Sequence, residues 1–324
     1  MPKNSSKPRS QSAGKPGQAS FERQRRDARL SAAPPPTVSG RWLLKAIVIS
    51  VAAAALCCWG VFCLLFWQGC WQLLYHPASV VTRTPASAGV RFDPVAFAAT
   101  DTGATRLAGW WIPAGPQAAF SRYTVLSLHG KDGNLGNTVD DLAELHATGV
   151  NVLAFDYRGY GRSQFAHPSE GHLRQDTEWA LQYLTGTRQI APGSIVLDGE
   201  GLGADLALEE AAVHPELAGV ILRQPIEDPV RVIFNDPRAR LVPARLLVRD
   251  RYDLDAPAIK LRIPSLWFVP DQPDGKSAAA GLQSAYENVG APKMRVWLLN
   301  GASAPKQIED TLARWLANLA SKPR

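Results

Sequence analysis

Cysteine is almost absent from this chain of 324 residues, and its four copies all lie between residues 57 and 70. The stretch from residue 71 to the end therefore has no disulfide framework, no cysteine nucleophile and no thiolate metal site. The sequence also lacks an HExxH motif and any paired histidine and carboxylate motif, so nothing in it supports metal catalysis. We expect no metal and no cofactor.

Histidine is scarce, and the C-terminal third has none. The six histidines are His76, His129, His146, His167, His172 and His214. No residue after 214 can therefore supply an imidazole base.

Charge is missing from one long stretch, Ala46–Trp67, which has 22 apolar or uncharged residues. About 20 such residues span the hydrocarbon of a bilayer. Trp42, Trp71 and Tyr75 lie near the ends, as interfacial aromatic residues do. We predict a transmembrane anchor and juxtamembrane segment over 42–75. A cleaved signal peptide is the alternative, but its tail and apolar region are usually shorter.

The net charge of +6 is concentrated before this anchor. Residues 1–45 carry ten Lys and Arg and two acidic residues, whereas residues 46–324 carry 25 basic and 27 acidic residues. The basic tail predicts an N-terminus in the cytoplasm, a folded domain on the far, extracytoplasmic side, and contact with anionic membrane lipid. Without a basic domain face, we expect no nucleic-acid partner. Residues 1–41 are polar and proline-rich, and we expect a disordered tail.

Strand and helix patterns alternate through residues 76–324. A hairpin is expected over 93–113, and later strands and helices follow one another as in a parallel sheet covered on both faces. The remaining predicted strands are 123–130, 150–159, 195–197, 218–225, 264–271 and 294–299; the predicted helices are 138–149, 170–184, the segment after residue 201, 278–287 and 305–319. The fold class is therefore α/β.

One turn in this pattern has the shape of a nucleophile elbow. Ser194–Glu216 reads as a short strand, a glycine turn and an alanine-rich helix. A G-x-S-x-G elbow places serine at the tip of such a turn. Here the pattern is Gly199, Gly201 and Gly203, with Gly201 at the tip. The turn also matches the G-x-G-x-x-A loop of dinucleotide-binding proteins, but the acidic residue expected at the end of the next strand is missing.

The sequence resembles the α/β-hydrolase superfamily over about residues 70 to 320. It is most similar to the membrane-anchored, BEM46-like branch related to serine aminopeptidases of the S33 type and monoacylglycerol lipases. The resemblance is carried by LLYHP, DTGATRLAGWWIP, LSLHGKDGN, FDYRGYGRSQFAHPSEGHLRQD, the glycine elbow and LRIPSLWFVPD. It implies an α/β-hydrolase fold after one transmembrane helix, and a catalytic serine, acid and histidine in that chain order.

The resemblance also assigns positions to the machinery. Backbone N–H groups of Lys131 and Leu202 would form the oxyanion hole, and Gly201 occupies the nucleophile position. The acid is expected at Asp271 or Asp274, as the remnant of a triad. The base position falls at Ala304. In a serine protease, loss of either nucleophile or base costs on the order of 10⁶ in rate.

We therefore expect a catalytically impaired hydrolase relative that binds a small molecule, a lipid or a protein through the old cleft. A short cap is expected over that cleft at 226–260. One alternative is a working esterase, lipase or peptidase whose rearranged groups include Asp198, Glu200 or His129. Another is a structural subunit of an envelope complex.

Overall fold

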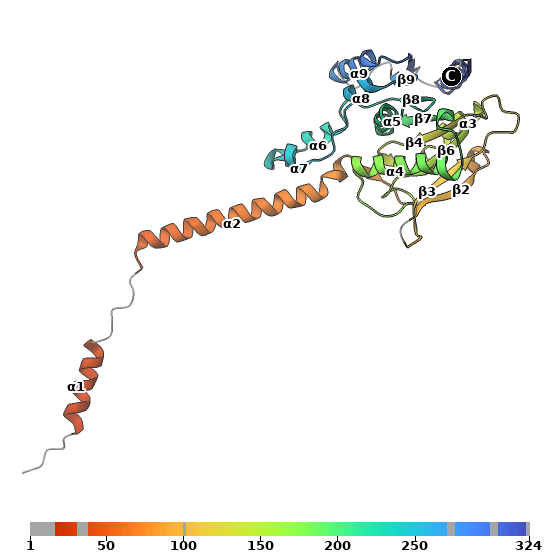
Figure 1. The fold of residues 1–324 in the computed structure, drawn as a ribbon. Coiled ribbons are helices and arrows are strands. Elements are labelled where there is room, and N and C mark those ends of the chain that lie inside the picture. The colour runs from red at the N-terminus through yellow and green to blue at the C-terminus, as the bar shows by residue number, and fades with distance from the viewer. Residues whose placement is uncertain (1–16, 31–37, 100–101, 271–275, 299–303, 322–324) are drawn as a thin grey trace, which may run out of the picture. The chain divides into compact units, whose positions relative to one another are not determined.

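The computed structural model describes residues 17–30, 38–99, 102–270, 276–298 and 304–321 (Figure 1). These residues fall into two compact units, 1–60 and 61–324.

The first unit holds helix α1 (Gly17–Leu30) and most of helix α2 (Gly40–Gly69). Helix α1 was not expected, because the tail composition predicts disorder. Its central residues are good helix formers, and Glu22 precedes Arg26 by one helical turn, the favourable order for such a pair. The prediction of disorder considered only apolar burial and missed this local preference.

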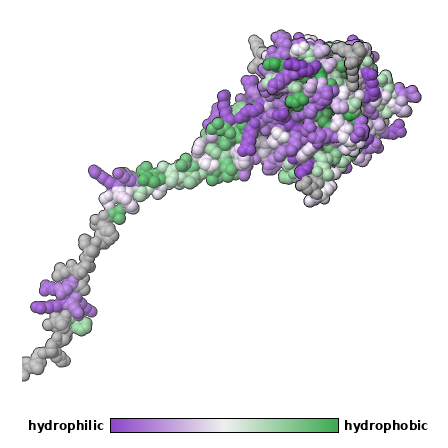
Figure 2. Space-filling model, in the orientation of Figure 1, coloured by the Kyte–Doolittle hydropathy of each residue, from purple (hydrophilic) through white to green (hydrophobic). Residues whose placement is uncertain are grey.

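Helix α2 contains the predicted apolar run and continues into the short helix η1 (Cys70–Leu73). Together Gly40–Leu73 are long and apolar enough to cross a membrane, and an 18-residue window within them has a mean hydropathy of 2.5. Figure 2 shows the apolar colouring along this helix. Length and composition alone support that assignment.

The second unit is built on an eight-stranded sheet with the order β10-β9-β8-β7-β4-β6-β3-β2. Strands β2 and β3 form the predicted hairpin, β3 pairs antiparallel with β6, and all other neighbours are parallel. The strands are β2 (Asp93–Ala99), β3 (Thr105–Ile112), β4 (Thr124–Leu128), β6 (Asn151–Asp156), β7 (Ile195–Glu200), β8 (Gly219–Arg223), β9 (Ser265–Pro270) and β10 (Lys293–Leu298). A separate parallel pair joins β1 (His76–Pro77) to β5 (Asp132–Gly133).

Helices cover both faces of this sheet (Figure 1). Helices α3 (Val139–Ala147) and α10 (Ala304–Ser321) pack on one face, where their apolar residues meet Val196 and Ile221. Helices α4 (Glu170–Gln182), α5 (Leu202–Val213) and α9 (Lys276–Asn288) pack on the other, against Leu197 and Leu222. Adjacent residues of a strand point to opposite faces. The two faces therefore have separate cores, and the predicted doubly covered sheet is confirmed.

The segment predicted as a cap, 226–260, is a series of short helices. They are α6 (Arg231–Asn235), η6 (Pro237–Leu241), α7 (Ala244–Leu247) and α8 (Asp255–Lys260). The remaining short helices are η2 (Pro85–Ala88), η3 (Leu135–Asn137), η4 (Tyr183–Thr187) and η5 (Pro192–Ser194).

Candidate active-site region

The turn from β7 to α5 has a backbone that only glycine adopts readily. Gly201 has φ +55° and ψ −119°, outside the regions allowed to residues with a side chain. Its N–H donates to the Arg223 carbonyl at 2.9 Å, and its carbonyl accepts from the Ala204 N–H at 3.0 Å. Hydrogen bonds on both sides thus hold the tip of the elbow.

The three glycines of the elbow differ in the space around them. A Cβ atom on Gly199 would overlap the Gly203 carbonyl, and one on Gly203 would overlap the carbonyl oxygens of Leu128 and His129. Among the described residues, a Cβ atom on Gly201 would meet a single atom within 4 Å, the Cδ1 of Ile226 at 3.8 Å. Packing therefore demands the two flanking glycines, whereas these residues leave room for a Cβ atom at the tip.

The predicted oxyanion-hole residues leave the sheet at neighbouring strand ends. Leu128 of β4 pairs with Gly199 of β7, so Lys131 and Leu202 each lie three residues beyond that pair. Leu202 is the first residue of α5, where an N–H has no acceptor within the helix. The carbonyl of Lys131 accepts from the His76 N–H at 3.0 Å and from the Tyr160 hydroxyl at 2.9 Å. These contacts fix the backbone of the predicted hole on the β4 side.

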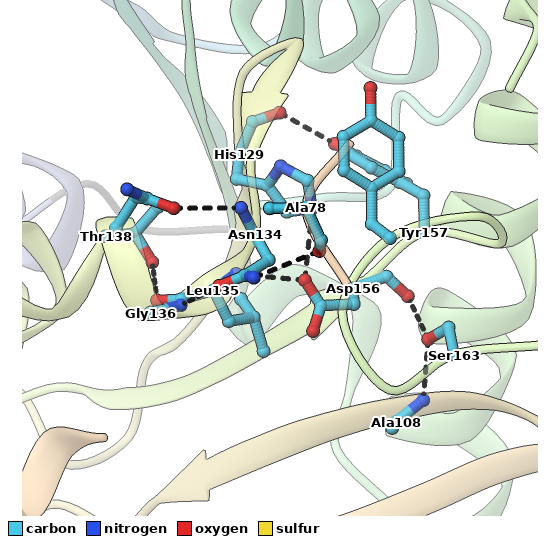
Figure 3. Close-up of polar contacts among 12 residues, drawn as sticks. Ala78, Ala108, His129, Asn134, Leu135, Gly136, Thr138, Asp156, Tyr157 and Ser163 are labelled. Atoms are coloured by element: carbon cyan, nitrogen blue, oxygen red, sulfur yellow. Dashed lines mark hydrogen bonds and ion pairs between the residues drawn. The ribbon is translucent and has the colours of Figure 1, made fainter. Parts of the chain in front are cut away.

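His129 is a buried residue of the core and not a displaced base. Its Nδ1 lies 2.8 Å from the Gly130 carbonyl. Its ring packs against Tyr157, with centroids 4.4 Å apart (Figure 3), and against Tyr160, with centroids 5.0 Å apart. Its Nε2 is 3.7 Å from the Asp156 carboxylate, beyond hydrogen-bond reach. Burial lowers the pKa of His129 to about 4, so the ring is neutral near pH 7.

The residues of the DYRGYGRS motif hold the loop between β6 and α4. The Asp156 carboxylate accepts from the Leu135 N–H at 2.9 Å, and the Ser163 hydroxyl bridges the Asp156 carbonyl and the Ala108 N–H (Figure 3). Arg158 forms a buried ion pair with Asp176 at 2.6 Å. These motif side chains are engaged in structure.

The rest of the motif also serves the loop. Ser169 caps α4 by accepting from the His172 N–H at 3.3 Å, and the His172 ring contacts the His167 carbonyl at 3.0 Å. Neither serine of this region, Ser163 or Ser169, has a histidine oriented as its base.

A buried ionic cluster beneath the elbow was not foreseen from the sequence. Asp198 of β7 binds Arg223 of β8 at 2.8 Å, and Asp141 of α3 lies 3.8 Å from the same guanidinium. Burial raises the pKa of Asp198, and the bond to Arg223 opposes that rise. Asp198 therefore forms a structural ion pair with Arg223. The sequence shows a charged residue in each of two otherwise apolar strands, but it does not show that these strands are neighbours.

Glu200 directly precedes the tip in the chain. Burial, assisted by the Asp141 carboxylate, raises the pKa of Glu200 to about 7. Its side chain follows the Val196 and Asp198 side of the strand, towards α3, because strand residues alternate. This residue can exchange a proton near neutral pH, but it does not occupy the position of an elbow nucleophile.

Comparisons with known proteins fit this geometry. The family model described as serine aminopeptidase, S33, matches residues 120–250. The uncharacterised protein Rv2307c of Mycobacterium tuberculosis is 31% identical over 202 residues, which cover 62% of this chain and 69% of that protein. The uncharacterised protein YfhR of Salmonella typhimurium is 32% identical over 196 residues, covering 56% and 63%. The chain belongs to the α/β-hydrolase superfamily.

Solved structures agree on the fold of this superfamily member. An esterase of Pyrococcus furiosus has a TM-score of 0.57 at 19% identity, covering 76% of this chain and 98% of that one. The α/β hydrolase GrgF of Penicillium sp. sh18 has a TM-score of 0.53 at 19% identity, covering 71% and 98%. At such identities the similarity shows the fold alone.

The acid and base positions of the superfamily fall at the edge of what the structure describes. Asp271 and Asp274 lie outside the described residues. Ala304 is the first residue of α10, and its side chain lies outside them too. These positions stay predictions.

Every histidine of the chain has an identified contact away from the elbow. Beyond those already described, His76 contacts Asp132 at 2.6 Å, His146 contacts the Pro113 carbonyl at 3.2 Å, and His214 contacts Glu216 at 2.9 Å. His167 stacks on Trp71 with ring centroids 4.8 Å apart. No rearranged base for the elbow emerges from these contacts.

Among the described residues, one group has atoms close enough together to hold a metal ion. It consists of Glu178 on α4, Glu210 on α5 and His214, which directly follows α5. Gly201 directly precedes α5, so this group lies at the far end of the helix from the elbow. The Arg174 guanidinium faces Glu210 at 3.7 Å, and these charges compensate one another as ion pairs.

Proposed function

We propose that this chain is a membrane-anchored member of the superfamily that binds a ligand in its cap region without hydrolysing it. The observation that carries the proposal is Gly201: the elbow is intact and has room at its tip, yet no atom there can attack a carbonyl carbon. The absence of any histidine after His214 supports the same conclusion. Oxyanion-hole donors and binding alone leave about 10³–10⁴ over water, far below a useful hydrolase.

The cap lines a cavity that begins, along the chain, one residue after the residue that faces the elbow. Ile226, whose side chain faces Gly201, leads directly into a cavity of about 700 Å³ lined from residue 227 onward. That volume lies within the range of small-molecule sites. The lining is apolar at Val230, Phe234 and Leu254. Its charged residues are three arginines and four acids: Arg231, Arg245, Arg251, Glu227, Asp228, Asp253 and Asp255. A small amphipathic molecule fits this mixture best.

The anchor and its direction are part of the proposal. The support is the apolar helix ending at Leu73 and the basic tail before it. We place the N-terminus in the cytoplasm and residues 76–324 on the far side. Alkaline phosphatase is active only outside the cytoplasm, so a fusion of this enzyme after residue 324 should be active. A stable but inactive fusion would contradict the proposed orientation of the chain in the membrane.

Ester turnover tests the absence of catalysis. The purified full chain should hydrolyse p-nitrophenyl esters of short and medium chain length no faster than a heat-denatured sample. Gly201→Ser should change this little, because the base is still missing. Robust turnover by the wild-type chain, blocked by a cleft-directed inhibitor, would overturn the proposal.

Ligand binding is tested on the chain purified from its native membranes. Native mass spectrometry should show a bound species of constant mass. Phe234→Asp, which places a charge in the cavity, should abolish it, whereas Val232→Asp on the exposed side of the same helix should not. Equal retention by both variants would place the ligand elsewhere.

A second candidate function is hydrolysis through rearranged groups. The raised pKa of Glu200 beside the elbow is the observation that favours it. This candidate predicts an activity that Glu200→Gln removes while the fold is retained. The first proposal predicts no activity for Glu200→Gln to remove.

A further inference from the structure

The end of α2 and the helix η1 form a cavity together with two other segments of the second unit. We call residues 61–73 the foot of α2. Trp67 and Trp71 of the foot, the stretch 167–172 and the stretch 247–250 line a cavity of about 810 Å³. Helix α6 also contacts η1. Because the uncharged apolar run ends at Trp67, the groups that touch Trp67 and Trp71 lie at the boundary of the membrane if α2 crosses it.

The two most exposed large apolar side chains described after residue 73 both lie beside this foot. They are Phe165, 84% exposed, and Leu246, 83% exposed. The Phe165 ring meets His167, and His167 stacks on Trp71 of the foot. Leu246 precedes Leu247, which lines the cavity at the foot. Two segments far apart in sequence therefore bring unburied apolar groups to the same place.

Positive charge is concentrated in the same segment. The stretch 231–251, here called the basic cap, contains six arginines and two acidic residues. The arginines are Arg231, Arg238, Arg240, Arg245, Arg249 and Arg251, and all are exposed. Residues 46–324 as a whole carry more acidic than basic residues, so this excess is local. The Arg249 guanidinium lies 5.4 Å from the centre of the Trp67 ring, which connects the basic cap to the foot.

We infer that the basic cap, with Leu246 and Phe165, rests on an anionic bilayer surface where α2 enters it. Guanidinium groups bind lipid phosphates through paired hydrogen bonds, and leucine and phenylalanine enter the boundary between headgroups and acyl chains. Each arginine near such a surface contributes about a fivefold preference for anionic over neutral lipid. The inference rests on the proposed anchoring by α2 and extends it, since the anchor alone does not require a lipid contact by the cap.

Hydrogen–deuterium exchange on the full chain in nanodiscs tests the inference. One set of discs contains phosphatidylcholine alone, and the other contains phosphatidylcholine with phosphatidylglycerol. Amides of residues 231–251 should exchange at least about fivefold more slowly on the anionic discs. Raising the salt concentration to 1 M should reduce the difference, because it screens exposed charges.

Matched charge reversals separate the basic cap from general charge. Arg240→Glu, Arg245→Glu and Arg249→Glu together should remove the slower exchange. Arg91→Glu, Arg122→Glu and Arg314→Glu reverse three exposed arginines elsewhere and should leave it intact. Leu246→Ser should weaken the protection on anionic discs.

Four results would overturn the inference. Equal exchange on both kinds of disc would exclude a charge-dependent contact. Loss of protection in both triple variants would show that the contact depends on overall charge and not on the basic cap. Slower exchange of the basic cap in detergent with an RNA homopolymer, without slower exchange on anionic discs, would show that the basic cap binds a polyanion and not a membrane. Alkaline carbonate extraction tests the anchor separately: release of the chain overturns both proposals, whereas retention with unchanged exchange overturns this inference alone.

Discussion

The tip of the elbow and the loop between β6 and α4 both carry motifs of the same superfamily. The loop keeps the side chains of its motif, whereas the tip lacks the side chain that its motif requires. In the loop, Arg158 pairs with Asp176 of α4 and Ser163 hydrogen-bonds to Asp156, and these contacts hold the structure. At the tip, the described residues leave room for a Cβ atom on Gly201. The comparison teaches that the resemblance is carried by residues needed for packing. The position that would perform chemistry is the one that packing leaves free.

The flanking glycines offer the largest test of this comparison. Gly203→Ala forces a Cβ atom onto the carbonyl oxygens of Leu128 and His129. We expect a loss of about 4 kcal/mol or more in the free energy of unfolding, or no folded protein. Denaturant titration followed by circular dichroism measures it. A loss below about 1 kcal/mol would mean that close packing does not require this glycine.

Breaking the buried ion pair of the loop should have the next largest effect. Arg158→Met leaves the Asp176 carboxylate without its guanidinium, at an expected cost of about 3–5 kcal/mol. Arg262→Met, at an exposed arginine, is the control and should change stability by less than about 0.5 kcal/mol. Similar effects of the two substitutions in thermal unfolding would show that the motif is not structural.

Glu200 predicts a dependence of stability on pH. Its pKa of about 7 in the folded state lies above the ordinary value of 4.5, so the folded chain binds this proton more tightly. The contribution is therefore favourable at low pH and is lost as pH rises from about 4.5 through 7. Glu200→Gln should raise the free energy of unfolding at pH 8 by about 3 kcal/mol relative to its effect at pH 4, since each unit of pKa shift corresponds to about 1.4 kcal/mol.

The control for this pH dependence is Asp93→Asn, at an exposed position of β2. Urea titrations of the wild-type chain and both variants at pH 4, 6 and 8 measure the difference. If Asp93→Asn changed the free energy of unfolding with pH in the same way as Glu200→Gln, Glu200 would not be the source of the pH dependence.

The tip itself should give the smallest effect. Gly201→Ala has room for its Cβ atom but must adopt a strained backbone, which costs about 1–3 kcal/mol. Reduced freedom of the unfolded chain offsets about 0.4–1 kcal/mol of that. We expect a net loss of about 1 kcal/mol, well below that of Gly203→Ala. Equal losses of free energy of unfolding for Gly201→Ala and Gly203→Ala would contradict the proposal that packing restricts the flanking glycine more than the tip.

Most of the fold was predictable because periodicity and glycine placement are local signals. Strand β7, the elbow and α5 follow directly from a short apolar run, three glycines and an alanine-rich stretch. The ion pair of Asp198 with Arg223 was not predictable, because it depends on which strands are neighbours. The contact of Ile226 with the tip depends on the path of the cap, which has no periodic pattern.

The site was predictable to a different extent. Sequence located the elbow and its missing serine, but not the space at the tip or the burial of His129, which are properties of packing. The assignments of Asp271, Asp274 and Ala304 still rest on the resemblance alone. Helix α1 shows the converse, since composition predicted disorder where local helix preference prevails.

The most direct test of the central claim is intact-protein mass spectrometry after treatment with a fluorophosphonate probe. The purified full chain should show no added mass, and no probe-modified peptide should appear from residues 194–216. A stoichiometric phosphonyl adduct on any residue of this chain, lost on heat denaturation before labelling, would contradict the account.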